Sequence, residues 1–420
     1  MTPVQRWSGA ARCGPDARDP AQHLRDSHAK WHVHSLWMID SRNIREIWAW
    51  TTDARDVIDP LHLAGPPPAP PAPDLRLVDW EPRARVRLPR TDVPRAAVPA
   101  VDVHNHLGRW LTADWCAPDV PALLDLLDRT NVRAVVNLDG LWDDELEANL
   151  DRYDRAHPGR FLTFCQVDWT ALARVGGERE VQRQLRDAAA RGARGLKVWK
   201  NLGLTVTGPD GALVAPDDPR VVETLALAGE LGLPVLIHVA DPKAFFDPPD
   251  RYNERVDELT AQPSWSFADR SRFPSFEHLL DAFGRLLAAT PGTTYVGAHV
   301  GCVAEDLDHV SRLLRAAPNL VVDIAGRLGE LGRQPRRFRR LVEDFPDRVL
   351  FGTDAFPLSR EQLETHFRFL ETADEHFAYS PGDPVPPQGR WAISGADLPA
   401  HLLPALYAGN ACRVLGLDAD

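Results

Sequence analysis

From about residue 98 onward, the chain alternates between two hydrophobic patterns. Short apolar, β-branched runs predict strands, and between them apolar residues recur at helical spacing. Because strands and helices alternate eight times, we expect an α/β fold with a parallel sheet, closed as a (β/α)₈ TIM barrel. A doubly wound sheet is the alternative, but it would gather fewer strand ends at one site. The strands are expected at 98–103, 133–138, 161–168, 194–199, 234–238, 294–298, 319–324 and 348–353, and helices at Val120–Arg129, Glu180–Arg191, Val221–Leu231, Phe276–Thr290 and Leu307–Ala317.

The first 97 residues lack this regularity. Residues 1–75 are rich in Trp and His and end in a proline run, Pro66 to Pro73, which predicts a disordered tail and a stiff linker. A partner-docking or capping segment and an extra metal site are alternatives for this part. Residues 76–97 contain alternating stretches, Leu75–Val78 and Ala84–Leu88, which predict a small β extension. The barrel would then occupy residues 98–420, including a closing helix at Leu402–Leu417.

Composition narrows the function classes. The formal net charge of −12 argues against a general nucleic-acid binder, which needs a basic face. No apolar run reaches the roughly 20 residues of a membrane span, and no secretory signal pattern opens the chain. The five cysteines are scattered without disulfide or CxxC spacing, so we expect a cytoplasmic protein. Nothing in the composition decides whether it is a homo-oligomer.

Four of the predicted strands end in side chains that can bind metal. The first ends in His104-Asn105-His106, and the others in His238, His299 and Asp354. His104 and His106 are two residues apart, so they point to the same side of a strand and can share one ion. A barrel gathers its strand ends at one face. Nitrogen and oxygen ligands with an open position predict a catalytic Zn²⁺ site, or a site for a similar divalent ion.

This arrangement resembles the amidohydrolase superfamily, and within it the broad amidohydrolase-related branch of hydrolases, lactonases, hydratases and decarboxylases. The resemblance covers roughly residues 95–420 and rests on the four motifs above. It implies His104, His106, His238 and Asp354 as ligands of one ion, and His299 as a second-metal ligand or an acid/base group. It also implies that Asn410–Leu417 is the closing helix of this branch, so Cys412 is expected to be structural.

Lys197, on the fourth predicted strand, decides the number of metal ions. In two-metal members of the superfamily, a lysine at this place is carboxylated and bridges the ions. A lysine that binds a substrate carboxylate, or one that forms a structural ion pair, is the alternative. We therefore expect one ion, or two if Lys197 bridges.

These features predict a metal-dependent hydrolase that cleaves an amide, ester or lactone bond in a small anionic molecule. Asp354 would accept a proton from the activated water, and His299 would protonate the leaving group. A decarboxylase or hydratase on the same scaffold is the alternative, and a metal-binding protein without turnover is a further one. Long loops such as 241–275 favour a packed lid. Substrate contacts are expected at the barrel rim, where solvation or ion pairing is the alternative role, from Arg109, Trp199, Lys200 and Arg327, with Asp323 and Glu330 beside them.

Overall fold

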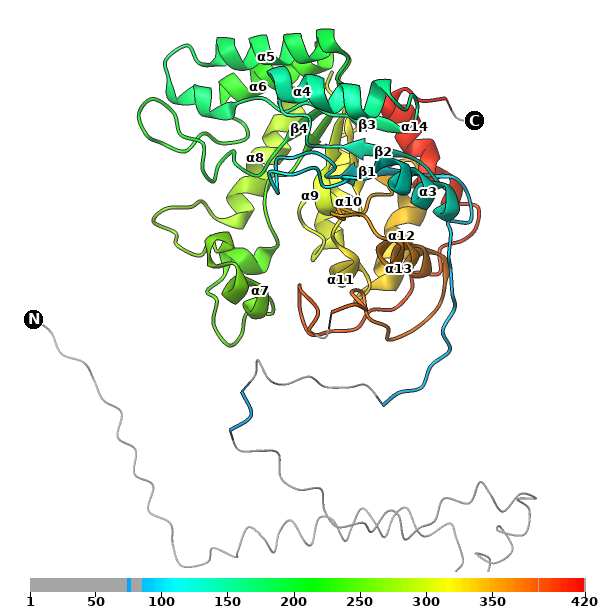
Figure 1. The fold of residues 1–420 in the computed structure, drawn as a ribbon. Coiled ribbons are helices and arrows are strands. Elements are labelled where there is room, and N and C mark those ends of the chain that lie inside the picture. Colours follow the sequence, from blue (N-terminus) through cyan, green and yellow to red (C-terminus); the bar gives the residue numbers. More distant parts are fainter. Residues whose placement is uncertain (1–73, 77–84, 384, 419–420) are drawn as a thin grey trace, which may run out of the picture. The chain divides into compact units, whose positions relative to one another are not determined.

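All eight predicted strands are present in the computed structural model, which describes residues 74–76, 85–383 and 385–418 (Figure 1). They pair in parallel and in chain order, as two sheets with the orders β1-β2-β3 and β4-β5-β6-β7-β8. The strands are β1 (Ala100–Asn105), β2 (Val132–Asn137), β3 (Phe161–Thr163), β4 (Leu196–Val198), β5 (Val235–Ile237), β6 (Tyr295–Gly297), β7 (Leu320–Asp323) and β8 (Val349–Leu350).

Backbone hydrogen bonds at two junctions join these sheets into a closed barrel. Between β3 and β4, the amide of Lys197 donates to the carbonyl of Cys165 at 2.7 Å. Between β8 and β1, the amide of Val103 donates to Phe351 at 3.1 Å, and that of Asp354 donates to His104 at 2.8 Å. The second junction also fixes Asp354 against the His104 turn. The predicted (β/α)₈ barrel is confirmed.

Helices follow the strands and form the outer layer (Figure 1). Their starts have the expected chemistry: the Asp218 carboxylate accepts a hydrogen bond from the amide of Arg220, and Pro219 occupies the first turn. The five predicted helices are α3 (Val120–Thr130), α5 (Glu178–Arg191), α6 (Pro219–Glu230), α8 (Phe276–Ala289) and α10 (Leu307–Ala316). The others are α4 (Asp143–Asn149), η4 (Leu150–Arg155), η5 (Trp169–Ala173), η6 (Lys243–Phe246), α7 (Val256–Ala261), η7 (Pro263–Trp265), α9 (Ala298–Gly301), α11 (Leu328–Leu331), α12 (Pro335–Asp344), α13 (Arg360–Glu371), η8 (Ala405–Gly409) and α14 (Asn410–Leu415).

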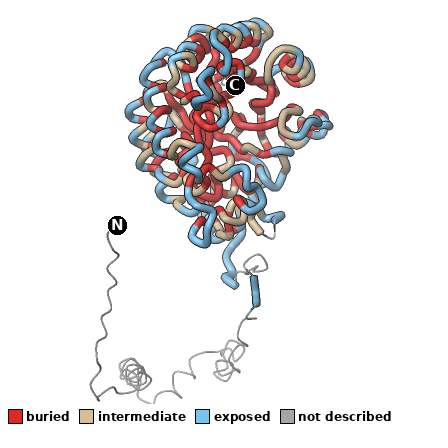
Figure 2. Tube along the Cα trace, turned by 90° about the vertical axis from the view of Figure 1, so that its left-hand side faces the viewer, coloured by how far each residue is buried: buried red, intermediate tan, exposed pale blue. Residues whose placement is uncertain are grey.

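Two apolar clusters support the barrel. One fills its interior with alternate strand residues such as Val101, Val103 and Leu236, and the other lies between strands and helices. Figure 2 shows buried residues concentrated along the strands and the inner helix faces. Ala411 and Cys412 of α14 belong to the interior cluster, so the closing helix has the structural role expected for it. No helix among the described residues is both long and apolar enough to cross a bilayer.

The expected β extension is not found in the described part of residues 76–97. Residues 85–88 have no strand structure, and Val86 and Leu88 are 63% and 39% exposed. An alternating stretch becomes a strand only when a neighbour pairs with it, and 85–88 pair with no described strand. The prediction is therefore wrong for 85–88. The other predicted strand lies mostly outside the described residues, as does nearly all of the predicted tail.

Candidate metal centre

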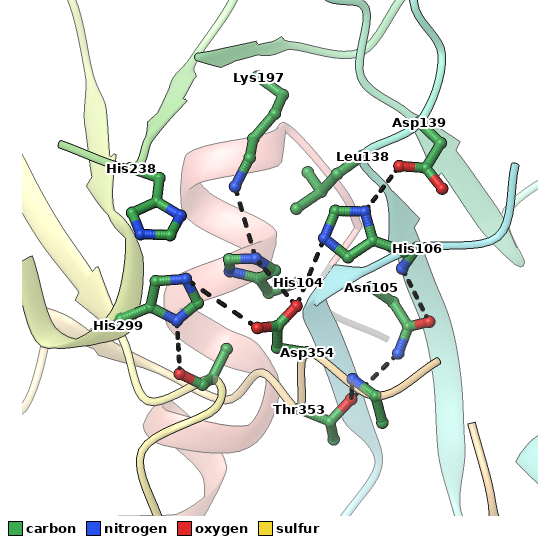
Figure 3. Close-up of polar contacts among 12 residues, drawn as sticks. His104, Asn105, His106, Leu138, Asp139, Lys197, His238, His299, Thr353 and Asp354 are labelled. Carbon is green, nitrogen blue, oxygen red and sulfur yellow. Dashed lines mark hydrogen bonds and ion pairs between the residues drawn. The ribbon is translucent and has the colours of Figure 1, made fainter. Parts of the chain in front are cut away.

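Three of the four predicted ligands come together at the carboxyl ends of the strands (Figure 3). The side chains of His104 and His106 both point from β1 toward Asp354, which follows β8. One carboxylate oxygen, Oδ1 of Asp354, lies 3.6 Å from Nε2 of His104 and 3.4 Å from Nε2 of His106. Their ligand atoms all lie within 4.8 Å of one another. An ion about 2 Å from each atom would fit this spacing.

Two buried carboxylates orient the imidazoles. Nδ1 of His104 donates to Oδ2 of Asp323 at 2.9 Å, and Nδ1 of His106 donates to Oδ1 of Asp139 at 2.6 Å. Because each Nδ1 donates to a carboxylate, Nε2 is the nitrogen of each ring that is directed at the centre. The ligand geometry is thus fixed by the protein itself.

A third carboxylate, Asp102, ties the two strand ends together. It is fully buried and accepts hydrogen bonds from the amides of His104 and Thr353, the Thr353 hydroxyl and the Asn105 side chain, at 2.6–3.2 Å. Burial raises the pKa of Asp102 to about 6, although these four donors oppose the shift. The Asp102 contacts therefore hold the His104 turn and the Asp354 turn in one fixed arrangement.

His299 approaches from the other side of Asp354. Its Nδ1 donates to the carbonyl of Ala325 at 2.7 Å, and its Nε2 lies 4.0 Å from Oδ2 of Asp354. Its φ is +57°, a conformation that the bond from its amide to Asp323 supports. Burial and the charge of Arg327 hold the pKa of His299 well below its usual value. His299 is therefore neutral, with a free acceptor at Nε2.

His238 lies beside this group rather than within it. Its ring centroid is 4.4 Å from that of His299, but it is absent from the described clusters of mutually close ligand atoms. Its Nε2 is 3.4 Å from Oδ1 of Asp241, and neither ring nitrogen has a hydrogen-bond partner among the described residues. Burial lowers the pKa of His238 to about 3, so the ring is neutral. Two unpaired, buried nitrogens are costly unless a ligand occupies them.

Lys197 is fully buried in the barrel, and its Nζ lies 3.5 Å from Nε2 of His104. Burial lowers the pKa of the Lys197 amine to about 8, against the opposing effect of the Asp354 and Asp323 carboxylates. The lowered pKa increases the fraction of neutral amine, which is the form that can react with CO₂. This environment is compatible with either role expected for Lys197.

The surroundings shift the pKa values of the site's titratable groups in different directions. Burial alone would lower the pKa of His106, but the carboxylates of Asp139 and Asp354 outweigh it and raise the pKa to about 9. Burial and the nearby Lys197 lower the pKa of His104. The pKa of Asp354 lies below its usual range, because the surrounding histidines outweigh the effect of burial. Asp354 is therefore an ionised carboxylate.

The four expected substrate residues differ in their surroundings. Arg109 is 41% exposed and forms a bidentate ion pair with Glu145, at 2.6 and 3.1 Å. Lys200 is paired with Asp241 at 2.5 Å. The Trp199 ring forms edge contacts with His106 and His238, so it borders the metal centre. Arg327 is buried, and its described hydrogen bond goes only to the carbonyl of Gly326.

The long segment after β5 is packed, as expected for a lid. Phe245, Phe246 and Phe267 are buried, and Trp265 stacks on Phe245. The Lys200 amine lies over the Trp265 ring at 5.2 Å, which connects this segment to the β4 end of the site.

The sequence also matches the model of a known protein family. The family model described as Amidohydrolase matches residues 101–417, which is most of the chain. The chain belongs to the amidohydrolase family. It is accordingly a metal-dependent enzyme of the amidohydrolase type. A comparison with curated proteins finds no match.

Several solved structures are similar to this amidohydrolase at low identity. An uncharacterized TIM-barrel protein from Bordetella bronchiseptica is 14% identical, with a TM-score of 0.47 over 76% of this chain and 99% of that one. An amidohydrolase from Burkholderia multivorans with bound zinc is 16% identical, with a TM-score of 0.47 over 76% and 100%. The 2,6-dihydroxybenzoate decarboxylase from Rhizobium is 16% identical, with a TM-score of 0.46 over 76% and 99%. The family membership rests on the match over residues 101–417.

Sequence reasoning missed two carboxylates of this amidohydrolase site, Asp102 and Asp139, and gave a third, Asp323, a different role. Asp102 lies two residues before His104, but its carboxylate bonds the side chains of Asn105 and Thr353 rather than facing the ion site, and the spacing alone does not identify it. Asp139 follows the apolar run of β2, as the other site residues follow their own strands. Asp323 was expected to be a rim residue, but it holds His104 instead.

Proposed function

We propose that this amidohydrolase is a hydrolase that uses one divalent ion, most simply Zn²⁺, to cleave an amide, ester or lactone bond in a small, carboxylate-bearing molecule. The observation that carries the proposal is the approach of two oriented imidazoles to one oxygen of Asp354. In this proposal His104, His106 and Asp354 hold the ion. His238 completes the set, since its buried nitrogens lack partners among the described residues.

The donor set suits such an ion, because imidazole nitrogens and an ionised carboxylate are the ligands that Zn²⁺ takes with an open coordination position, and His106 would release its second proton when the ion binds. When bound, the ion supplies a Lewis acid and lowers the pKa of a coordinated water toward neutrality. Carboxylation of Lys197 would add a second ion. We propose the one-ion form, because the four residues above suffice to hold a single ion.

Asp354 and His299 form a route for the proton. Oδ1 of Asp354 faces His104 and His106, whereas Oδ2 is 4.0 Å from Nε2 of His299. Because Nδ1 of His299 is committed to the Ala325 carbonyl, only Nε2 can take up a proton. We infer that Asp354 accepts the proton from water and that His299 passes it to the leaving group.

The buried Arg327 supports an anionic substrate. It lies close enough to influence the pKa of His299, and a guanidinium forms bidentate bonds with carboxylates. The other two cations of the predicted set are less suitable, since Arg109 is paired with Glu145 and Lys200 with Asp241. We also infer a cytoplasmic location, because a reducing compartment suits buried free thiols such as Cys165 and Cys302.

The decisive experiment combines metal analysis with product analysis. Purified full-length protein should contain about one divalent ion per chain. A chelator should remove its activity on a panel of carboxylated amides, esters and lactones, and Zn²⁺ should restore it. Unsaturated acids and aromatic carboxylic acids complete the panel. Release of CO₂, or addition of water to a double bond, without any hydrolysis would replace the hydrolase with the lyase alternative. Metal-free protein with full activity would rule out both.

Two arginine variants test the substrate class. Arg327→Ala should raise KM for a carboxylated substrate by about 10- to 100-fold, the equivalent of one charge-assisted contact. Arg109→Ala removes an equal charge from the same rim and is the matched control, with KM unchanged. Equal effects of the two variants would contradict a specific role for Arg327.

A further inference from the structure

A groove of about 520 Å³ lies between α10 and α12, two neighbouring helices of the outer layer (Figure 1). Residues three or four apart share one face of a helix, so each helix lines the groove with one stripe of side chains. Leu307 and Leu341 are almost fully buried and form its floor. No described residue of the lining belongs to the metal centre, and the volume lies within the roughly 300–1,000 Å³ of ligand pockets. The groove can therefore hold a whole small molecule away from the proposed active site.

The lining of this groove is basic, although the whole chain has a formal net charge of −12. Its charged residues are four arginines and two aspartates, which leaves more positive than negative charge: Arg312, Arg315, Arg337, Arg340, Asp308 and Asp344. Part of this excess comes from a run in α12, where four of the five residues from 336 to 340 are arginines. A local basic surface on an acidic protein attracts anions. The groove is therefore suited to an anionic ligand.

Three of the four guanidinium groups are available to such a ligand. Arg315 is exposed and has no carboxylate partner in the described part of the chain, and its guanidinium lies 5.3 Å from the centre of the Phe345 ring. The nearest carboxylate oxygens lie 3.9 Å from Arg312 and 3.7 Å from Arg340, which is too far for a hydrogen bond. The fourth group, Arg337, is closely paired with an aspartate of α10 at 2.6 Å. Both walls of the groove thus present N–H groups that no described carboxylate binds closely.

A chain of phosphate groups matches this arrangement better than a single small anion does. A guanidinium binds phosphate oxygens through two parallel hydrogen bonds. Arg312 and Arg315 lie about one helical turn apart on α10, and Arg337 and Arg340 have the same spacing on α12. A ligand therefore needs several anionic groups to reach the arginines of both walls, and each group of a phosphate chain carries negative charge.

We propose that the groove between α10 and α12 binds a polyphosphate anion, either inorganic polyphosphate or the phosphate chain of a nucleotide. Arg312, Arg315 and Arg340 supply its main contacts, because their N–H groups are not closely bound by a carboxylate. Asp344 opposes binding, since it adds a negative charge to the same groove. This site goes beyond the proposed function and does not depend on it, because the groove and the metal centre have no described residue in common.

Calorimetric titration of the metal-loaded full chain with orthophosphate, tripolyphosphate and ATP tests this site. Tripolyphosphate should bind more tightly than orthophosphate by about 10-fold, the equivalent of two or three exposed ion pairs. The double variant Arg315→Gln/Arg340→Gln should lose most of this preference. Asp344→Asn removes the opposing charge and should instead strengthen tripolyphosphate binding by about 2- to 5-fold. ATP that binds at least as tightly as tripolyphosphate identifies a nucleotide as the ligand, and weaker ATP binding identifies inorganic polyphosphate.

Arg179→Gln/Arg186→Gln removes the same charge from exposed positions on α5 and is the matched control, which should bind all three probes as wild type does. Tripolyphosphate held at the metal centre would bind Arg315→Gln/Arg340→Gln as tightly as wild type, and that result overturns the proposal. Equal binding of orthophosphate and tripolyphosphate to wild type, or an equal loss in the α5 variant, also overturns it. If Arg315→Gln/Arg340→Gln fails to fold, Asp344→Asn decides, because unchanged or weaker binding by that variant counts against the groove. Metal content is measured after each titration, since a polyphosphate can also chelate a divalent ion.

Discussion

Two sides of the barrel mouth both bury charged groups, but they differ in how many hydrogen bonds these groups form. At the β1–β8 side, all four hydrogen bonds of Asp102 are formed, and Asp139 and Asp323 each hold a histidine. At the β5–β7 side, Arg255 lies 3.4 Å from Glu330 and 3.3 Å from Glu258, distances at which no hydrogen bond of good geometry forms. The buried carboxylates on the β1–β8 side thus have hydrogen-bond partners within the protein, whereas several buried charged atoms on the β5–β7 side do not.

This difference separates two tasks within one site. Catalytic groups must be held in place before substrate arrives, since a fixed electrostatic environment has no reorganisation cost during the reaction. Substrate contacts are instead completed by the ligand itself. Glu330 and Arg255 are almost fully buried and form an ion pair at 3.4 Å, yet both oxygens of Glu330 and two nitrogens of Arg255 lack hydrogen-bond partners among the described residues. We therefore propose that the β1–β8 side supplies the preformed ligands His104, His106 and Asp354, and that the β5–β7 side, where His238 lies, is completed by the ion and substrate that it binds.

The largest effect should come from breaking the β1–β8 side at its centre. Asp354→Asn keeps the shape of the side chain but removes a charged ligand and the proton acceptor. We expect kcat/KM to fall by about 10²- to 10⁴-fold, the range for a catalytic acid–base group, with a loss of bound metal. Steady-state kinetics and metal analysis measure this. An Asp354→Asn variant with normal metal content and rate would show that the ion is held elsewhere.

The second prediction concerns Glu258, a carboxyl group on the β5–β7 side. Burial, together with Asp241 and Glu330, raises the pKa of Glu258 from 4.5 to about 7, although Arg255 and Arg327 oppose the shift. Because the folded pKa is the higher one, the stability gained from protonated Glu258 is full below about pH 4.5 and is lost as the pH rises through 7. The free energy of unfolding should therefore fall by up to about 3 kcal/mol over this range.

Urea unfolding at a series of pH values checks this slope. Glu258→Gln stays neutral at every pH and should flatten the dependence between pH 4.5 and 7. Glu223→Gln, at an exposed position on α6, should keep the wild-type slope. Identical pH profiles for wild type and Glu258→Gln would mean that the charge of Glu258 is compensated after all, and the contrast between the two sides would disappear.

A third prediction sharpens the role of the groups behind the ligands. Asp139→Asn removes the negative charge that orients His106 while keeping the size of the side chain. Metal affinity should fall by about 10- to 100-fold, as is usual when the partner of a histidine ligand is changed. Titration with Zn²⁺ and a competing chelator measures the affinity. Asp144→Asn removes an exposed charge nearby and should leave the affinity unchanged, so equal effects would point to general electrostatics instead.

The barrel and the ligands of the β1–β8 side could be predicted from sequence because both depend on local rules, whereas the roles of the carboxylates behind these ligands were not foreseen. Apolar runs locate the strands, and period-two alternation places His104 and His106 on one side of β1. Closure of the barrel then brings Asp354 to them, so predicting this group needs no knowledge of the loop conformations. The strand prediction over residues 85–88 was wrong because alternation alone does not make a strand. Alternation is present there, but no described strand pairs with these residues.

The β5–β7 side could not be predicted in the same way, because its contacts join residues far apart in the chain. The Asp241 carboxylate that faces His238 is also bound by Lys200, so the position of the ring depends on the loop after β4. The same holds for a long-range contact elsewhere on the rim: the ion pair that removes Arg109 involves Glu145 on α4, and nothing in the pattern of either residue indicates it. Such pairs follow from loop conformation, which hydrophobic periodicity does not encode.

The smallest expected effect comes from a backbone position that joins the two sides. Gly326 has a φ of +62°, and a Cβ there would lie 3.1 Å from Oδ2 of Asp354 and 3.5 Å from Nδ1 of His299. Gly211 has a φ of +79° with nothing near its Cβ position. Gly326→Ala and Gly211→Ala should therefore each cost about 1–2 kcal/mol in the free energy of unfolding, from the left-handed conformation alone. Only Gly326→Ala should also weaken Zn²⁺ binding, because its Cβ crowds the Asp354 carboxylate. Equal Zn²⁺ affinity in the two variants would show that Asp354 can move without losing the ion, and that the β1–β8 side is less rigid than its hydrogen bonds indicate.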